Sequence, residues 1–426
     1  MEKEIEILSM DPFKLCDRDR YVACVGDNGG TDNETIWMGF RDSALILIDN
    51  IVNHNGTEDE LIYPIVYCCR HSFELCLKIV IEKIREIYKI KGMDSHVRIE
   101  DIHTHNLESL NIIVCQIYSV DRRIKPIYDK IIPFLSDYEF DEKGDVFKYE
   151  TDQSGVPHLK RLNISQISIT ILKVKFVEAM KLCNYLIFEL EYYIKEYKLH
   201  VFTNKLSRED IKEISKQLPA YTKWDTDGMV EIKNKIKGQY QLGSKEFGEA
   251  LSLIKVHREF CSNIGLEIPF GNIKNKDIDI YCNLIKYYSE TENGSKIHCK
   301  KFGDDFKESL DIMQKRHKEI EKITCSLDME SIIYIATFHD IGKEYEAFSE
   351  KIMYYYDNYK ENSDIDRSWL LRKIGKTRAC AYILRGMKMC GQTSYYKKLS
   401  EGILEKNIII ESAFNDEYGE FTDSIL

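Results

Sequence analysis

The segment from Leu61 to Ile90 constrains the fold most strongly, because it is apolar on nearly every side of a helix and yet carries a row of charges. Arg70, Glu74 and Lys78 follow one another at intervals of four residues and therefore share one helical face. A helix this apolar is predicted to be buried, so its charges must be paired or must line a cleft. The row is therefore either a ladder of ion pairs that satisfies itself or one wall of a polar pocket between helices.

Proline usage extends the helical prediction to the whole chain. Only 7 of the 426 residues are proline and none follows Pro269, so we predict an all-α protein with long helices. Because 426 residues exceed the usual size of one hydrophobic core, several domains are expected. The predicted divisions are an N-terminal extension at residues 1–35, a helical bundle at 36–200, a middle helical region at 201–303 and a C-terminal helical region at 304–426.

Apolar periodicity places individual helices within these regions. The predicted helices cover residues 37–52, 61–90, 107–120, 164–197, 206–217, 229–260 as one or two helices, 277–289, 305–323, 329–339, 344–359 and 367–389. Ser207 and Asp210 have the spacing of a capping box and predict the start of one helix. The polar stretch at 136–158 is predicted to be a loop.

Charge, hydropathy and cysteine usage exclude several classes of protein. The net charge of −11 argues against a protein whose whole surface binds nucleic acid. No window approaches the roughly 20 apolar residues of a membrane span, and the first residues lack the apolar run of a secretory signal. The 13 cysteines include no C-x-x-C pair and are expected to be buried thiols in a reducing cytoplasm. We therefore expect a cytoplasmic protein with no membrane contact, no metal and no cofactor.

A local basic segment runs from residue 367 to residue 400, where no acidic residue occurs. Its nine positive charges are interleaved with aromatic side chains, the mixture that contacts phosphates and stacks on bases. The basic residues are Arg367, Arg372, Lys373, Lys376, Arg378, Arg385, Lys388, Lys397 and Lys398, and the aromatic residues are Trp369, Tyr382, Tyr395 and Tyr396. The segment is predicted to bind nucleic acid, and the alternative is a solvated helical face with ordinary core aromatics.

An acidic tail follows the basic segment directly. Residues 401–426 contain seven acidic residues and a single basic residue, Lys406. Since opposite charges within about 8 Å attract at physiological salt, we expect this tail to fold back over the basic segment and to weaken nonspecific RNA binding.

Two helical patterns in the N-terminal half resemble the helical core of the HEPN superfamily. They are YPIVYCCRHSFELCLKIVIEK and, after a gap, HTHNLESLNII. Members of the superfamily show Arg-His followed by Glu-Leu and Leu-Lys on one long helix, and His-Asn/Asp-Leu at the start of a later helix. The matching residues here are Arg70, His71, Glu74, Leu75, Leu77, Lys78, His105, Asn106 and Leu107. A Phe-Arg-Tyr element of such proteins is similar to DVFKYETDQSG, with Lys148 in place of Arg, and the resemblance covers about residues 36–200.

The resemblance implies a helical bundle that commonly forms homodimers and is frequent in toxins, anti-phage systems and RNA-processing proteins. Its ribonucleases act without metal: a His moves a proton at the ribose 2′-hydroxyl or the leaving oxygen, and an Arg stabilises the phosphorane. Arg98 precedes His103 and His105 with the spacing of that Arg–His pair, although the usual polar residue after Arg is here Ile99. The resemblance thus implies an RNA-binding or RNA-cleaving protein. The catalytic candidates are Arg98, His103, His105, Arg70, His71, Glu74 and Lys78.

Two alternatives stay open. His339-Asp340, followed by Lys343, resembles the metal-binding doublet of HD-type phosphohydrolases, although the upstream His317 is closer than usual. The other alternative is a noncatalytic helical module for interaction or ligand sensing. Burial separates a site from a scaffold: convergence of Arg70 and its neighbours on an open cleft favours a site, whereas complete pairing in the interior favours a scaffold.

Overall fold

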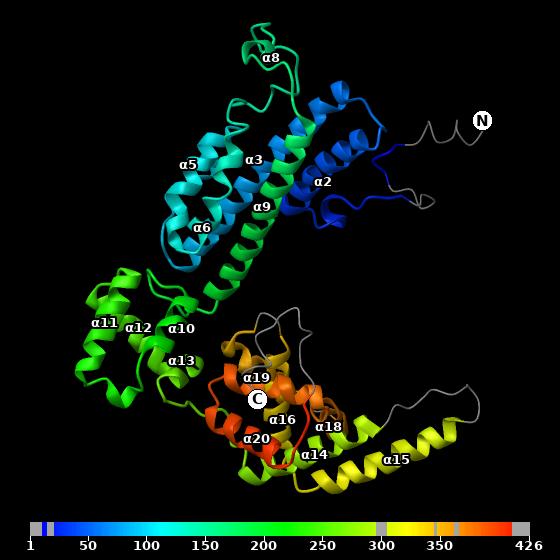
Figure 1. The fold of residues 1–426 in the computed structure, drawn as a ribbon, viewed down its shortest axis with the longest axis vertical. Helices are drawn as coiled ribbons and strands as arrows, with labels where there is room; N and C mark the ends of the chain where they lie inside the picture. Colours follow the sequence, from blue (N-terminus) through cyan, green and yellow to red (C-terminus); the bar gives the residue numbers. More distant parts are fainter. Residues whose placement is uncertain (1–10, 15–20, 295–304, 345–346, 362–365, 411–426) are drawn as a thin grey trace. The chain divides into compact units, whose positions relative to one another are not determined.

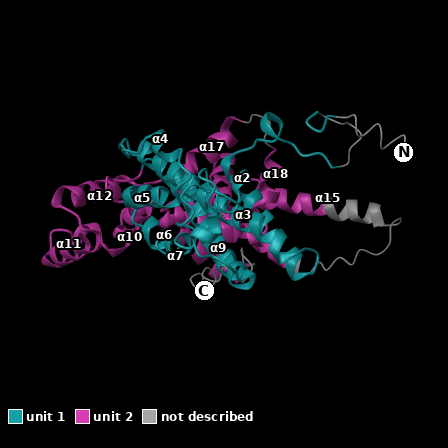
Figure 2. Cartoon of the chain, turned by 90° about the horizontal axis from the view of Figure 1, so that it is seen from above, with its two compact units in different colours: residues 1–200 teal, residues 201–426 magenta. Residues whose placement is uncertain are grey.

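The computed structural model describes residues 11–14, 21–294, 305–344, 347–361 and 366–410 (Figure 1). Its regular structure is helical, which confirms the all-α prediction. Within those ranges there is no β-strand, and one isolated bridge joins Thr151 to Pro157 inside the predicted loop. No helix in the described part of the chain is both long enough and apolar enough to cross a membrane. The chain divides into two compact units, residues 1–200 and 201–426 (Figure 2).

Unit 1, residues 1–200, is built around the predicted buried helix α3. Its helices are η1 (Gly26–Asn28), α2 (Asn33–Val52), α3 (Glu58–Ile90), α4 (Ile99–Ile102), α5 (Leu107–Ile117), η2 (Tyr118–Val120), α6 (Ile124–Tyr128), α7 (Ile132–Leu135), α8 (His158–Arg161) and α9 (Ile169–Tyr197). Helix α3 packs against α2, α5 and α9, and 15 of its 33 residues are buried. The side chain of Asp32 caps α2 by accepting the Thr35 N–H at 2.7 Å, and Asn106 caps α5 by accepting the Ser109 N–H at 2.7 Å.

Unit 2, residues 201–426, contains two hydrophobic cores, one within residues 206–264 and one within residues 270–408. The helices are α10 (Arg208–Gln217), η3 (Tyr221–Lys223), α11 (Asp227–Tyr240), α12 (Ser244–Val256), α13 (Arg258–Asn263), α14 (Asn275–Gly294), α15 (Asp305–Thr324), α16 (Met329–Lys343), η4 (Ser349–Lys351), α17 (Ile352–Glu361), α18 (Arg367–Ile374), α19 (Thr377–Met389) and α20 (Thr393–Glu405). Helix α14 packs against α15, α19 and α20, so a division at residue 303 separates helices that share one core.

Several helical segments differ from the sequence prediction. Of the described residues in the predicted helix 344–359, only those from Ser349 onward are helical, as η4 and α17, and the short helices α4, α6, α7 and α8 were not predicted. The stretch 229–260 belongs to three helices, because Gln241 adopts a left-handed conformation and ends α11, and His257 adopts an extended conformation between α12 and α13. The predicted helix 367–389 is broken at Gly375, where a Cβ atom would lie 2.5 Å from the ring of Tyr288. Helix α20 was not predicted; it follows a turn at Gly391, whose φ of +63° favours glycine.

A buried charge network joins α10 and α13 to η4 within unit 2. The side chain of Arg208, 4% exposed, lies between Glu259 and Glu350. Arg208 Nε donates to Glu350 Oε1 at 2.6 Å, Nη2 donates to Glu259, and His257 Nε2 lies 2.9 Å from the same Glu350 oxygen. Burial by itself raises the pKa of Glu350, but the hydrogen bonds with His257 and Arg208 outweigh it and lower the pKa to about 2.

We expect acid to weaken unit 2 through Glu350. A depressed folded-state pKa contributes stability that is complete above the unfolded value of about 4.3 and is lost as the pH falls through about 2. The difference corresponds to at most about 3 kcal/mol. Urea unfolding between pH 2 and pH 6 measures it, and Glu350→Gln should flatten this part of the pH dependence. An identical pH dependence in wild type and variant would contradict the assignment.

Candidate nucleic-acid interface

The charged row on α3 is a buried and paired ladder. The side chains of Arg70 and Glu74 are 3% and 2% exposed, and Arg70 Nη1 donates to Glu74 Oε2 at 3.0 Å. Arg70 Nε and Nη2 also donate to the Asp141 carbonyl at 3.1 and 2.9 Å, and Nη2 donates to the His105 carbonyl. Lys78 Nζ donates to Glu74 Oε1 at 2.8 Å. Of the two alternatives for this row, the geometry favours the structural ladder.

Two histidines contact the same buried carboxylate. His105 Nδ1 lies 2.9 Å from Glu74 Oε1, and His71 Nδ1 lies 3.7 Å from Glu74 Oε2. Burial raises the pKa of Glu74, but the hydrogen bonds with His71, Lys78 and Arg70 outweigh it and hold the pKa well below its ordinary value. The side chain of His105 is 69% exposed, whereas that of His71 is 21% exposed and stacks on Tyr67. Glu74 is therefore an ionised anchor for His105 at the surface of unit 1.

The structure places Arg98 apart from this ladder. Arg98 precedes α4, and its side chain is 72% exposed. It donates to the carboxylate of Asp101 at 2.9 and 3.2 Å, which is a local pair at the start of a four-residue helix. His103 is exposed at the end of α4. Among the described residues Arg98 pairs with Asp101 and Glu100, and with neither His103 nor His105.

The basic segment divides into two parts in the fold. Residues of α18 and the start of α19 line a large pocket, whereas the later part lies elsewhere on unit 2. Arg385 Nη1 donates to the Gly342 and Glu344 carbonyls at 2.7 and 2.9 Å, and the Tyr395 hydroxyl donates to the Gly271 carbonyl at 3.1 Å. The predicted nucleic-acid residues that do not line the pocket are Arg385, Lys388, Tyr395, Tyr396, Lys397 and Lys398. Arg385 and Tyr395 are thus structural side chains.

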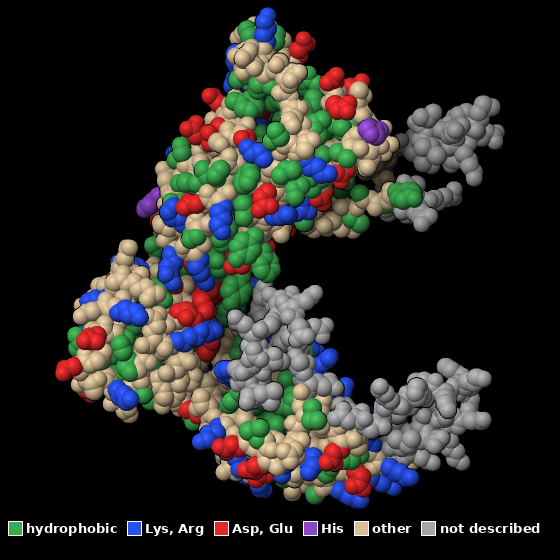
Figure 3. Space-filling view, viewed as in Figure 1, with side chains coloured by type: hydrophobic (Ala, Val, Ile, Leu, Met, Phe, Trp, Pro, Cys, Tyr) green, Lys and Arg blue, Asp and Glu red, His purple; other side chains and the backbone are tan. Residues whose placement is uncertain are grey.

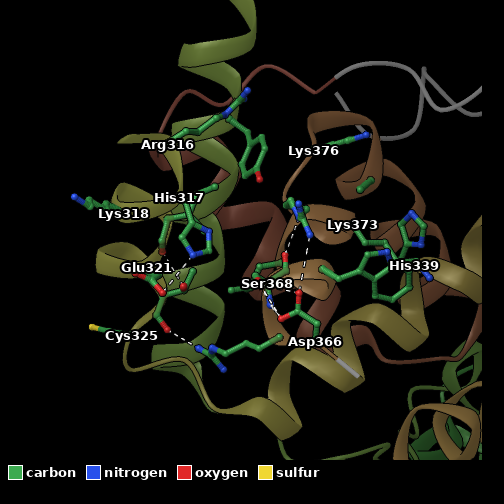
Figure 4. A pocket seen from close by; sticks show the side chains of 18 of the residues that line it. Arg316, His317, Lys318, Glu321, Cys325, His339, Asp366, Ser368, Lys373 and Lys376 are labelled. Carbon is green, nitrogen blue, oxygen red and sulfur yellow. Dashed lines mark hydrogen bonds and ion pairs between the residues drawn. The ribbon is translucent and has the colours of Figure 1, made fainter. Parts of the chain in front are cut away.

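The pocket, which we call the basic pocket, has a volume of about 1750 Å³ and lies among α14, α15, α16, α18 and α19 (Figure 4). Eight Lys and Arg residues line it against two carboxylates. The cations are Arg316, Lys318, Lys343, Arg367, Arg372, Lys373, Lys376 and Arg378, and the carboxylates are Glu321 and Asp366. His317, His339, Trp369, Tyr382 and Tyr288 also line it. By contrast, Lys and Arg alternate with Asp and Glu over the visible face of unit 1 (Figure 3).

Several of these cations are available to an anionic ligand. Lys318, Lys343 and Lys376 are exposed and have no ion pair or side-chain hydrogen bond among the described residues. Lys376 also precedes α19 without providing a side-chain cap, so the positive end of that helix dipole adds to the field at the pocket. Arg367 has a different role, because its Nη2 donates to the Thr324 and Leu327 carbonyls at 2.7 and 2.9 Å and secures the end of α15.

The α16 wall of the basic pocket contains the predicted HD doublet. His339 Nδ1 lies 2.9 Å from Asp340 Oδ1, and Lys373 Nζ lies 2.6 Å from the same oxygen. The Tyr359 hydroxyl donates to Asp340 Oδ2 and accepts from Lys373 Nζ at 2.6 Å. Burial raises the pKa of Asp340, but the hydrogen bonds with His339, Lys373 and Tyr359 outweigh it and lower the pKa.

A metal role for this doublet gains no support from its surroundings. In an HD-type site the Asp340 carboxylate would bind the metal cation. Here it already pairs with Lys373 and forms hydrogen bonds with Tyr359 and His339. In the described part of the chain, no group of three or more His, Cys, Asp and Glu side chains is arranged to hold a metal ion.

Three cations that line the basic pocket were not predicted to bind nucleic acid: Arg316, Lys318 and Lys343. Arg316 and Lys318 lie in a stretch of sequence that contains both positive and negative residues. They join the cations of α18 in the pocket only because α15 lies next to α18 in the fold. Most of the predicted acidic tail, residues 411–426, lies outside the described residues. A comparison of the chain with protein-family models, with curated proteins and with solved structures finds no significant match.

Proposed function

We propose that the protein binds single-stranded RNA in the basic pocket of unit 2. The observation that carries this proposal is the concentration of eight Lys and Arg side chains around one recess in a chain whose net charge is −11. A cluster of this kind releases counterions when it neutralises phosphates, and this release supplies much of the affinity for nucleic acids. The volume of about 1750 Å³ is larger than the usual range for small-ligand pockets, about 300–1,000 Å³, and suits several nucleotides better than one metabolite.

Aromatic side chains in the pocket favour a single strand. Trp369 is 48% exposed, and Tyr382 lines the same wall as His339. An unpaired base can stack on such a ring, which is worth about 1 to 3 kcal/mol per base, whereas a base inside a duplex is already stacked. Lys373 Nζ lies 5.3 Å from the Trp369 ring centroid, so a cation stands next to this stacking surface. The resemblance of residues 36–200 to HEPN proteins supports RNA as the ligand.

Salt-dependent binding tests the proposal with two matched triple variants. Lys318→Ala, Lys343→Ala and Lys376→Ala together remove three pocket charges, whereas Lys388→Ala, Lys397→Ala and Lys398→Ala remove three from the same unit outside the pocket. If each pocket lysine neutralises one phosphate, the slope of log affinity against log salt should become shallower by about 2 for single-stranded RNA. At 0.1 M salt this corresponds to a loss of about 100-fold in affinity.

The second triple is expected to change affinity and slope far less than the first. Filter binding of a short single-stranded RNA between 0.05 and 0.5 M salt provides both quantities, and circular dichroism checks the fold of each variant. Equal losses in the two triples would show that binding is spread over the surface, which contradicts the proposal. Preference for a duplex of the same length would contradict the single-strand part.

A further inference from the structure

The His339–Asp340 pair has the arrangement of a proton acceptor held by a carboxylate. Asp340 is ionised, and its Oδ1 lies 2.9 Å from His339 Nδ1. An ionised carboxylate accepts a hydrogen bond, so the proton of a neutral imidazole is drawn to Nδ1 and the lone pair is left on Nε2. A hydrogen bond from one ring nitrogen to a carboxylate also fixes the direction in which the other nitrogen points.

The free nitrogen of His339 is directed to the basic pocket. The residue is 6% exposed overall and lines the pocket. Its Nε2 makes no hydrogen bond within the described part of the chain. This atom is also not one of the fully buried polar atoms without a partner that occur there. The nitrogen is therefore open to the pocket, on the wall that His339 shares with Lys373 (Figure 4).

Cations from three helices line the pocket together with His339. Lys343 lies one turn beyond His339 on α16, and both side chains line the pocket. The ring of Tyr382 on α19 lies edge-on to the imidazole at 5.6 Å, and Arg378 lies one turn before Tyr382. Lys373 of α18 reaches the carboxylate that holds the imidazole. A phosphate next to His339 would therefore lie among positive charges that stabilise additional negative charge.

From this geometry we infer that the basic pocket cleaves RNA without a metal ion, with His339 as the general base. The inference rests on the proposed binding of RNA in the same pocket. His339 Nε2 takes the proton of a ribose 2′-hydroxyl, O2′ forms a bond to the adjacent phosphorus, and the bond from phosphorus to O5′ breaks. The departing O5′ keeps the electron pair and takes a proton from water. The products are a 2′,3′-cyclic phosphate and a 5′-hydroxyl end, so no oxidant, reductant or co-reactant is consumed.

Each neighbour of His339 has a distinct part in this step. Lys343 and Arg378 are the cations placed to stabilise the charge on the phosphorane. Asp340 is a positioning residue, because it acts on the imidazole and does not reach the substrate. Lys373 and Tyr359 hold the Asp340 carboxylate: Lys373 Nζ contacts Oδ1, the oxygen that His339 also contacts, and the Tyr359 hydroxyl donates to Oδ2.

Cleavage of a labelled single-stranded RNA by the full chain in the presence of EDTA tests the inference. We expect wild-type protein to produce cyclic-phosphate ends, and a matched oligonucleotide with 2′-deoxyribose at the cleaved position to stay intact. His339→Gln should reduce the cleavage rate by about 100- to 10,000-fold, the usual contribution of a general base. Its affinity for the uncleavable oligonucleotide should stay within about twofold of wild type. His96→Gln, at a side chain that is 86% exposed on unit 1, is the control and should cleave normally.

Asp340→Asn separates positioning from folding. The amide can no longer stabilise a positively charged imidazole, so the acidic limb of the pH–rate profile should move to lower pH while RNA affinity is retained. A residue with a purely structural role would change stability and leave the position of this limb unchanged.

Four outcomes would overturn the inference, and each differs from failure of RNA binding itself. They are binding of RNA by wild-type protein with no cleavage, normal cleavage by His339→Gln, loss of cleavage in EDTA, and loss of cleavage in Arg98→Ala or His105→Ala but not in His339→Gln. The third outcome would assign the doublet to metal chemistry, and the fourth would place the reaction in unit 1. Absence of binding by wild-type protein would instead overturn the proposed function.

Discussion

Glu74→Ala is expected to lower the free energy of unfolding of unit 1 by about 3 to 5 kcal/mol. The substitution removes one of the two buried carboxylates that pair with Arg70, which is 3% exposed, and it removes the partner of Lys78 and His105. Asp141 Oδ2 still lies 3.3 Å from Arg70 Nε, but this one carboxylate does not neutralise both Arg70 and Lys78, so one positive charge of the ladder stays uncompensated. Removing one member of a buried ion pair costs this much because the other charge cannot return to water.

A matched substitution on the same helix provides the control. Glu86 pairs with Lys198 at 2.8 Å, but both side chains are about half exposed, so Glu86→Ala should cost less than about 1 kcal/mol. Because the chain has two units, urea unfolding should be followed through hydrogen exchange of the α3 amides, which report on unit 1. Equal effects of the two substitutions on the free energy of unfolding would show that the charged row is exposed to solvent and is not a buried ladder.

Gly342→Ala is expected to destabilise unit 2 by about 3 kcal/mol or more, the upper end of the cost of overpacking. Helices α16 and α19 approach each other through glycine: a Cβ on Gly342 would overlap the Tyr382 carbonyl oxygen and would lie 2.7 Å from the Gly386 nitrogen. Gly386 faces the Phe338 carbonyl in the same way. These are backbone atoms, so no rotamer change relieves the clash and the two helices must separate.

The same substitution should also weaken RNA binding, because α16 and α19 form one wall of the basic pocket. Gly238→Ala is the matched control, since no atom lies within 4 Å of the added Cβ at this position in α11. There, alanine should stabilise the protein by up to about 1 kcal/mol. Thermal melting and filter binding measure both effects. A Gly342→Ala protein with wild-type melting and affinity would show that the helices do not pack as closely as described.

The two strongest expectations involve different kinds of contact. In unit 1 a charge is stabilised by partners that a substitution can remove, and the cost is electrostatic. In unit 2 two backbones meet where only glycine fits, and the cost is steric. Both contacts position a histidine: Glu74 anchors His105 at the surface, and the glycine crossing holds His339 next to Tyr382.

Features that depend on neighbouring residues can be predicted from the sequence alone. Helical spacing placed Arg70, Glu74 and Lys78 on one face, and the apolar residues around them predicted burial. The capping box at Ser207 likewise predicted the start of α10. These features are local: the interacting residues lie within four positions of one another, and helix geometry alone fixes their distances.

Contacts between groups that are distant in the sequence depend on the tertiary fold. Arg70 donates to the Asp141 carbonyl, which is 71 residues away in the sequence. Lys318, Lys343 and Lys376 belong to separate parts of the sequence and line the same basic pocket. The fold also shows that Arg385 is not part of the predicted nucleic-acid surface, because its guanidinium donates to two backbone carbonyls of unit 2. Such partners depend on how helices cross, and the crossing is set by side-chain packing over whole helix faces, which a local pattern of charge or hydropathy does not encode.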